Sequence, residues 1–304
     1  MSWMIWIAAI SVGLVLVCFG LGLVLGRFMA ASPRGAKPHY DGRDDFRTPA
    51  DLGLEAEDVA FGTDDGFTLR GWLIAGDPGK PALLCMHGGR DDKRYFLPLA
   101  PALHAAGYTV LLFDGRCHGD SDDDPGGLSL GIRDHRDVLA AVEFLGGRGF
   151  ERIGALGCSQ GGASVVIAAA QEPRIKALWI ESSGYDITAP LRVMAPWMPA
   201  FVRRLITMGT MVHLGYEARD VLTTHGPQLR LAARLQDRPV FLAHGGRDEI
   251  APLADFETYA AQFGPGARRW VLERGKHCIL RRGLDEYAPR AVGFFNEAFS
   301  LPEA

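Results

Sequence analysis

The stretch from Ile153 to Ala163 constrains the fold of this 304-residue chain more than any other segment. Residues 153–156 are apolar and match a short buried strand, and residues 163–171 match an apolar helix. Between them lies Gly157-Cys-Ser-Gln-Gly161, a G-x-S-x-G sequence. A turn this tight strains the serine backbone, and glycine on either side removes Cβ atoms that would clash. The pattern predicts a nucleophile elbow that holds the Ser159 hydroxyl above a sheet, at the N-terminus of a helix.

Alternating strand-like and helix-like segments surround this turn. Strands are expected at 81–86, 109–113, 153–156, 176–180, 240–244 and 269–272. Helices are expected at 128–145, 163–171 and 285–299. Two further strand-like runs, 59–61 and 67–74, flank an Asp-Gly pair that is typical of a hairpin turn. Short connections between alternating elements predict an α/β fold with a doubly wound, mostly parallel sheet.

Charge and cysteine content exclude several classes of protein. The formal net charge is −4 and the isoelectric point is near 6.1, so nothing in the charge favours nucleic acid as a partner. The five cysteines show neither metal-ligand spacing nor the pattern of a disulfide framework. They suit a reducing compartment, and no metal and no cofactor is expected.

The N-terminus carries a long uncharged segment. Residues 2–26 contain no charged side chain, and a helix of this length spans a hydrocarbon core of about 30 Å. We predict a transmembrane anchor over residues 1–28, with Trp3 and Trp6 at an interface. The alternative is a signal peptide cleaved near Met29–Ala31, but no Lys or Arg precedes the apolar run. Gly22 and Gly26 have the G-x-x-x-G spacing of helix dimer faces.

The remaining chain divides into a tether and a domain. Residues 29–58 are polar and proline-containing, which predicts a tether, and residues 59–304 form the domain. Basic residues follow the apolar segment closely: Arg27, Arg34, Lys37, Arg43 and Arg47. Basic flanks stay on the cytoplasmic side of a single span, so we expect a single-pass membrane protein with a cytoplasmic domain.

Residues 184–237 interrupt the strand–helix alternation and are expected to form a helical cap. Large apolar side chains are dense between 189 and 216. We expect Trp197, Met198 and Phe201 to line an apolar pocket for an acyl-type substrate, because methionine and large aromatics suit adaptable apolar sites. The alternative is a pair of ordinary amphipathic helices whose apolar faces pack inward.

An acid and a histidine follow later strands in the order Ser159, Asp248, His277. Each follows a strand end, so all three are expected at the carboxyl edge of one sheet. A serine hydroxyl becomes a good nucleophile when a neighbouring histidine takes its proton and an aspartate orients that histidine. Glu249 is the rival acid, and Cys158 is a rival nucleophile.

Two backbone amides are expected to bind an oxyanion. Gly89 follows the strand at 81–86, and its N–H is assigned as one donor opposite the N–H of Gln160. His87 precedes Ser159 in the chain, whereas the catalytic histidine is expected last, in the order Ser, Asp, His. His87 is therefore interpreted as a loop-organising residue. Arg116 and His118, with Asp114, receive the same structural interpretation.

These motifs together resemble the serine α/β-hydrolases. The resemblance rests on His87-Gly-Gly, Asp114-x-Arg-x-His-Gly-x-Ser121, Gly157-x-Ser-x-Gly-Gly162, Gly245-x-x-Asp248-x-x-x-Pro252 and Gly275-x-His277, and it runs from about Val59 to Phe299. Cys117 departs from the motif, which usually has glycine there. Within this superfamily, the sequence most resembles membrane-anchored esterases, lipases and acyl-thioesterases.

The resemblance implies hydrolysis of carboxylic esters or thioesters through an acyl-enzyme, with a small-molecule or lipid-like acyl substrate. It assigns Ser159 as nucleophile, His277 as base and Asp248 as acid. Alternatives on the same triad are an acyltransferase and a peptidase. A catalytically idle membrane scaffold is the alternative from a different class.

Overall fold

A computed structural model describes residues 2–31 and 47–300. Its centre is an eight-stranded sheet in the order β1-β2-β4-β3-β5-β6-β7-β8. The strands are β1 Glu57–Gly62, β2 Thr68–Ile74, β3 Ala82–Met86, β4 Thr109–Asp114, β5 Ile153–Cys158, β6 Ile175–Glu181, β7 Val240–Gly245 and β8 Arg268–Leu272. β2 runs antiparallel to both β1 and β4, and all other pairs are parallel. The expected mostly parallel sheet and its N-terminal hairpin are therefore confirmed.

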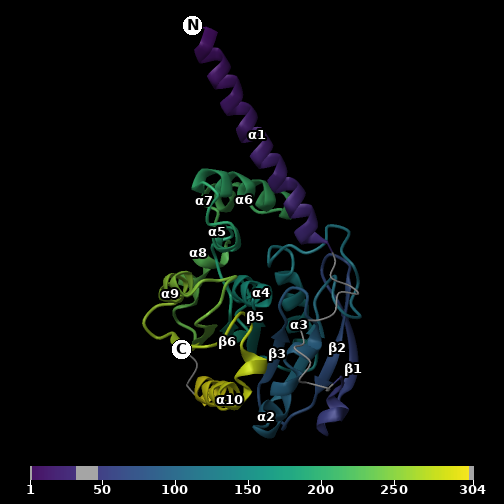
Figure 1. The fold of residues 1–304 in the computed structure, drawn as a ribbon. Coiled ribbons are helices and arrows are strands. Elements are labelled where there is room, and N and C mark those ends of the chain that lie inside the picture. Colours follow the sequence, from purple (N-terminus) through teal and green to yellow (C-terminus); the bar gives the residue numbers. More distant parts are fainter. Residues whose placement is uncertain (1, 32–46, 301–304) are drawn as a thin grey trace.

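Helices cover both faces of the sheet (Figure 1). On one face α3 (His135–Gly147), α4 (Gln160–Ala169) and α9 (Leu253–Gln262) enclose a buried core with the strands. On the other face α2 (Ala100–Ala105) and α10 (Leu284–Ser300) enclose a second core around Trp179 and Phe295. The central strands β3, β4 and β5 are buried along their whole length, as expected for strands covered on both faces.

Of the four α-helices in the segment 184–237, the first three lie beyond the carboxyl edge of the sheet and the fourth packs against α4 and α9 (Figure 1). They are α5 Ala189–Met194, α6 Ala200–Leu214, α7 Ala218–Thr223 and α8 Gln228–Ala232. We call this segment the cap. A hydrogen bond from Gln228 Nε2 to the Gly184 carbonyl oxygen (2.8 Å) joins the two ends of the cap at its base.

The N-terminal segment forms one helix, α1 (Ser2–Ala30). In the described part of the chain it is the single helix long and apolar enough to cross a membrane, and a signal sequence shares these properties. Its C-terminal half packs against α6 of the cap, where Thr210 Oγ1 donates a hydrogen bond to the Gly22 carbonyl oxygen (3.0 Å). The Ala30 carbonyl oxygen accepts a hydrogen bond from the Leu128 N–H (2.8 Å).

The expected tether, 29–58, overlaps residues 32–46, which lie outside the described residues. Its described end forms a short 3-10 helix at Pro49–Leu52, and β1 begins at Glu57. The adjoining sheet strand therefore starts two residues before the expected boundary at 59.

One expected helix begins later than its hydrophobic pattern indicates. The pattern predicts a helix over 128–145, but α3 begins at His135. The carboxylate of Asp134 accepts hydrogen bonds from Ser129 Oγ (2.9 Å) and the Gly131 N–H (2.7 Å). Leu130 and Gly131 both have positive φ angles, which an α-helix does not allow. Local side-chain bonds therefore hold this segment as a turn.

Candidate active site

Ser159 occupies a strained turn between β5 and α4. Its φ and ψ angles are 52° and −115°, a combination that non-glycine residues rarely adopt. A Cβ on Gly157 would lie 2.4 Å from the Gly161 carbonyl oxygen, and a Cβ on Gly161 would lie 2.2 Å from the Met86 carbonyl oxygen. Only glycine fits at either position, so the two glycines of the motif are explained by close backbone contact.

The three side chains singled out in the sequence meet at the carboxyl edge of the sheet. His277 Nε2 lies 2.8 Å from Ser159 Oγ, and His277 Nδ1 lies 2.8 Å from Asp248 Oδ2. An ionised carboxylate can only accept, so Nδ1–H donates to Asp248 and Nε2 accepts from the Ser159 hydroxyl. The geometry matches a serine that passes its proton to a histidine held in one tautomer.

Asp248 is held as a carboxylate. Its Oδ1 accepts hydrogen bonds from the N–H groups of Ile250 (2.9 Å) and Ala251 (2.8 Å). Burial raises the pKa of Asp248, but the hydrogen bond and charge of His277 outweigh it and hold that pKa below its usual range. The rival acid Glu249 is exposed. Of the two candidate acids, it is therefore Asp248 that contacts His277.

Two cysteines lie beside the triad in the chain and in space. Cys158 Sγ donates a hydrogen bond to Cys278 Sγ across 3.0 Å. This hydrogen bond lowers the pKa of Cys278, and the nearby His277 lowers it further. Burial acts in the opposite direction, and the resulting pKa is about 5. Burial raises the pKa of Cys158, whose side chain is fully buried, so this thiol is poorly placed to act as the nucleophile.

Cys278 also changes the pKa of His277. Burial lowers the pKa of His277, but the negative charge of Cys278 and the hydrogen bond to Asp248 outweigh it. The pKa of His277 is therefore held well above its usual range. Cys278 is a site residue that the sequence reasoning missed, because its role arises from contact with Cys158 across the fold.

The loop after β3 packs against the elbow. A Cβ on Gly88 would lie 3.3 Å from the Ser159 Cβ, and a Cβ on Gly89 would lie 3.0 Å from Gln160 Oε1. The N–H of Gln160 is at the first position of α4, where helix geometry leaves it without an intrahelical acceptor. The two amides assigned as oxyanion donors thus belong to segments that meet at Ser159.

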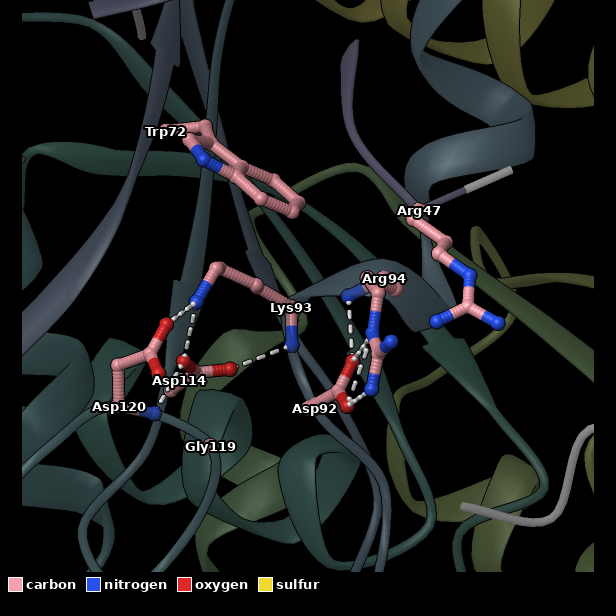
Figure 2. A pocket seen from close by; sticks show the side chains of 8 residues that line it. All are labelled: Arg47, Trp72, Asp92, Lys93, Arg94, Asp114, Gly119 and Asp120. Carbon is pink, nitrogen blue, oxygen red and sulfur yellow. Dashed lines mark hydrogen bonds and ion pairs between the residues drawn. The ribbon is translucent and has the colours of Figure 1, made fainter. Parts of the chain in front are cut away.

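Ion pairs fix the loop that carries Gly89. Lys93 donates from its backbone N–H to Asp114 Oδ1 and from Nζ to Asp114 Oδ2, both at 2.7 Å. Figure 2 shows this cluster with Trp72 beside the Lys93 ammonium, in a cavity of about 230 Å³. Lys93 also bonds Asp120 (2.5 Å), and Arg94 pairs with Asp92. These charges neutralise one another, so the cavity is a structural junction between the loops after β3 and β4.

His87, Arg116 and His118 have the loop-organising roles expected of them. His87 Nε2 accepts a hydrogen bond from the Gly115 N–H (3.0 Å), and His118 Nε2 accepts one from the Arg90 N–H (3.3 Å). Burial lowers the pKa of His118 to about 3, so its ring is neutral. The Arg116 guanidinium pairs with the buried Asp137 (2.8 Å) and with Asp65 (2.8 Å).

Glu181, at the end of β6, is a second residue that the sequence reasoning missed. Its buried carboxylate accepts hydrogen bonds from the hydroxyls of Tyr95 (2.5 Å) and Tyr287 (2.9 Å) and from the N–H groups of Ile279 and Leu280. Its backbone carbonyl oxygen accepts from the Ser159 N–H (2.8 Å). Burial and the charge of Cys278 raise its pKa to about 7. Glu181 thereby joins the elbow to the loop that carries His277.

The expected acyl-pocket residues lie at the surface of the cap. The side chains of Trp197 and Phe201 are 80% and 55% exposed, and Met198 is half-buried. The spacing of apolar residues identified the cap but not which side of it faces the sheet. Within residues 2–31 and 47–300, no group of three or more His, Cys, Asp and Glu side chains is arranged to hold a metal ion.

Comparison with known proteins identifies the same fold. A family model for the alpha/beta hydrolase fold matches residues 81–210. An esterase of Pyrococcus furiosus superposes with a TM-score of 0.66 at 24% identity, covering 83% of this chain and 95% of that protein.

Two relatives are similar in sequence. An uncharacterized protein of Mycobacterium tuberculosis is 33% identical over 209 residues, 67% of this chain, and the match spans 66% of that relative's length. A thiohydrolase of Aspergillus aculeatus is 36% identical over 123 residues, 39% of each chain.

Proposed function

Because this chain belongs to the α/β-hydrolase superfamily, we propose that it is a membrane-anchored serine hydrolase of carboxylic esters or thioesters. The single observation that carries the proposal is the hydrogen-bonded series Ser159–His277–Asp248, with 2.8 Å at both steps. The positive φ of Ser159 supports it, because such strain persists mainly where function requires it. Similarity to a thiohydrolase supports the substrate class.

In the proposed reaction, Ser159 Oγ attacks the carbonyl carbon of the substrate while its proton passes to His277 Nε2. The resulting imidazolium is stabilised by Asp248. His277 then returns the proton to the leaving alcohol or thiol, and the acyl group remains on Ser159 as an ester. A water molecule, deprotonated by His277, attacks this ester, and the carboxylic acid leaves as Ser159 regains its proton.

The N–H groups of Gly89 and Gln160 are the proposed donors to the oxyanion of each tetrahedral intermediate. The start of α4 adds the positive end of a helix dipole to the Gln160 N–H. The Lys93–Asp114 pair holds the Gly89 loop, so the donors need little reorganisation during the reaction.

We further propose that α1 is retained as a membrane anchor. The helix is joined to the domain by the hydrogen bonds from Thr210 to Gly22 and from Leu128 to Ala30. A Cβ on Gly209 would lie 2.2 Å from the Phe19 carbonyl oxygen, so α6 is shaped for close contact with α1. Removal of α1 would expose this complementary surface, which supports an uncleaved helix.

The domain is proposed to be cytoplasmic, because Arg27 and Arg47 lie on the domain side of the apolar segment. In intact spheroplasts, external protease should leave the domain whole, whereas permeabilised cells should allow digestion. Digestion from outside, or a mature N-terminus near Ala31, would contradict this part of the proposal.

The triad is tested with the full chain in a phospholipid nanodisc and a chromogenic ester. Ser159→Ala should fold normally and lose both turnover and labelling by an active-serine phosphonate. Asp248→Asn should lower kcat by up to ~10⁴-fold, because the wrong His277 tautomer is then favoured. Glu249→Gln is the matched control and should be near wild type. A lack of labelling in the parent would favour an idle scaffold, and a larger defect in Glu249→Gln would identify the wrong acid.

Hydrolysis and acyl transfer are separated by adding an alcohol acceptor. If water is the preferred nucleophile, a primary alcohol should leave carboxylic acid as the main product. Predominant formation of the new ester would indicate an acyltransferase. A peptide amide substrate cleaved faster than the matched ester would indicate a peptidase.

A further inference from the structure

Exposed large apolar side chains gather at one end of the domain. In the part of the chain described beyond α1, they belong either to the cap or to the segment after β7: Val193, Met194, Trp197, Phe201, Val212, Leu222, Ile250 and Leu253. Trp197 and Met194 are each 80% exposed. Scattered single apolar residues are normal on a soluble surface, but concentration on one end indicates an interaction surface. We call Val193, Met194, Trp197 and Phe201 the apolar face of the cap.

The level at which α6 crosses α1 indicates what covers this face. α6 touches α1 between Phe19 and Gly26, because Cβ atoms on Gly22 and Gly26 would lie 2.0 Å and 2.7 Å from Ile206 and His213 atoms. The helix from Trp3 to Gly22 is about 29 Å long at 1.5 Å per residue, close to the thickness of a hydrocarbon core. A span that begins at Trp3 thus leaves the hydrocarbon where α6 lies against it. Figure 1 shows α6 crossing α1, with the free part of α1 extending beyond it.

The charges near the apolar face suit a phospholipid surface. Residues 189–216 contain no aspartate or glutamate. Arg203 and Arg204 bond backbone carbonyl oxygens and so keep their positive charge, whereas the charge of Arg192 is neutralised by acidic residues outside this range. Arg203 donates hydrogen bonds to carbonyl oxygens of the α5–α6 connection, including those of Pro196 (3.4 Å) and Met198. It therefore holds the loop that presents Trp197. Basic residues beside exposed tryptophan and phenylalanine are typical of segments that lie in a membrane interface.

The apolar face adjoins the loop that carries the triad acid. Arg192 of α5 pairs with Asp186 (2.8 Å) and with Asp255 at the start of α9. The Ile250 N–H binds Asp248, while the Ile250 side chain is 51% exposed. The cap therefore contacts α9, which follows the loop that carries Asp248, and exposed apolar side chains occur on both the cap and this loop.

We propose that the apolar face of the cap inserts into the headgroup region of the bilayer that α1 spans, so that the enzyme takes an amphiphilic acyl ester or thioester directly from the membrane. This inference rests on the proposed function for the anchor and the substrate class. The partner is the phospholipid bilayer itself. The cap lies between the membrane and the triad, and a lipid substrate reaches Ser159 without crossing water.

Insertion is tested by fluorescence quenching, which does not depend on hydrolysis. The full chain with Trp3→Phe and Trp6→Phe is reconstituted in vesicles of phosphatidylcholine and phosphatidylglycerol, with or without bromine near the headgroup end of the acyl chains. Bromolipid should quench the remaining tryptophan emission, and Trp197→Phe should remove most of that quenching. Trp270→Phe, on half-buried β8, is the matched control and should retain it. Quenching that is absent, or that persists in Trp197→Phe, would overturn the proposal.

Uptake from the bilayer is tested by comparing two substrates. Val193→Ser/Met194→Ser should lower hydrolysis of a long-chain ester embedded in the vesicle by about tenfold relative to a water-soluble acetate ester, because apolar area that anchors the cap is lost. Equal losses with both substrates would overturn uptake from the membrane. If the parent hydrolyses neither substrate but Trp197 is quenched, the proposed hydrolase activity fails while insertion stands.

Discussion

Cys158 Sγ and Cys278 Sγ lie 3.0 Å apart, and each cysteine is the chain neighbour of a triad residue, Ser159 or His277. The contact joins the elbow to the histidine loop independently of the Ser159–His277 hydrogen bond. It also brings a second anionic group, after Asp248, next to the histidine ring. The pH dependence of activity should therefore change when Cys278 is replaced, although Cys278 takes no part in the proposed reaction.

Cys278→Ser should shift the acidic limb of the pH profile of kcat/KM to lower pH. The base must be neutral to accept the Ser159 proton, and the Cys278 charge raises the pKa of His277. Removing that charge lowers this pKa, so activity appears at lower pH. The profile is measured with a soluble ester that does not ionise over the pH range of the experiment. Cys85→Ser, with a buried thiol in β3, is the control and should leave the limb in place; an unshifted limb in Cys278→Ser would contradict the assigned cause.

Glu181→Ala should lower kcat more than it raises KM. Its carboxylate binds the N–H groups of Ile279 and Leu280, just after His277, and it touches no reacting atom. Loss of these bonds lets the histidine loop move, and small displacements of a base are costly in rate. Glu181→Gln keeps one acceptor oxygen and should recover part of kcat. A change confined to thermal stability, with kcat intact in both variants, would show that Glu181 has no positioning role.

Gly89→Pro should lower kcat by roughly 10²–10³-fold, because it removes one of the two N–H groups proposed to donate to the oxyanion. Gly89→Ala is the matched control: it keeps the N–H, and its added Cβ meets the flexible end of Gln160 at 3.0 Å. Steady-state kinetics with one ester distinguish the two. A loss that appears in KM alone, or an equal loss in both variants, would argue against a donor role for Gly89.

Gly22→Val should weaken the contact between α1 and the cap, because a Cβ at this position would lie 2.0 Å from the Ile206 carbonyl oxygen. Gly20→Val is the matched control, since nothing lies within 4 Å of a Cβ there. Proteolysis of the cap in the reconstituted full chain should become faster for Gly22→Val and stay unchanged for Gly20→Val. Equal rates in the two variants would show that α1 and α6 do not pack in the membrane.

Arg116→Met should lower the free energy of unfolding by about 3–5 kcal/mol, because it leaves the fully buried Asp137 carboxylate without its cation. Denaturant unfolding of the full chain measures the change. Arg116→Met combined with Asp137→Leu should recover much of the loss, since both buried charges are then gone. A double variant no more stable than Arg116→Met would indicate that packing, and not charge burial, dominates.

The sequence by itself determined the succession of strands and helices along the chain and the candidate residues of the site. Continuous apolar runs identified β3, β5 and β7, because strands covered on both faces cannot tolerate polar residues. Glycine spacing identified the turn at Ser159, because only glycine fits where backbone segments approach so closely. Asp248 and His277 each follow a later strand, and parallel strands end at one edge of the sheet. Both residues were therefore expected near Ser159.

Tertiary structure alone decided which residues surround the candidate site and which apolar side chains of the cap are exposed. Glu181 and Cys278 act through partners roughly 100 or more positions away, and local patterns carry no signal for such contacts. An apolar helix face predicts that something covers it but not whether the cover is the sheet or a membrane. The start of α3 was likewise decided by the Asp134 carboxylate binding Ser129 and Gly131, a local competition that the hydrophobic period does not register.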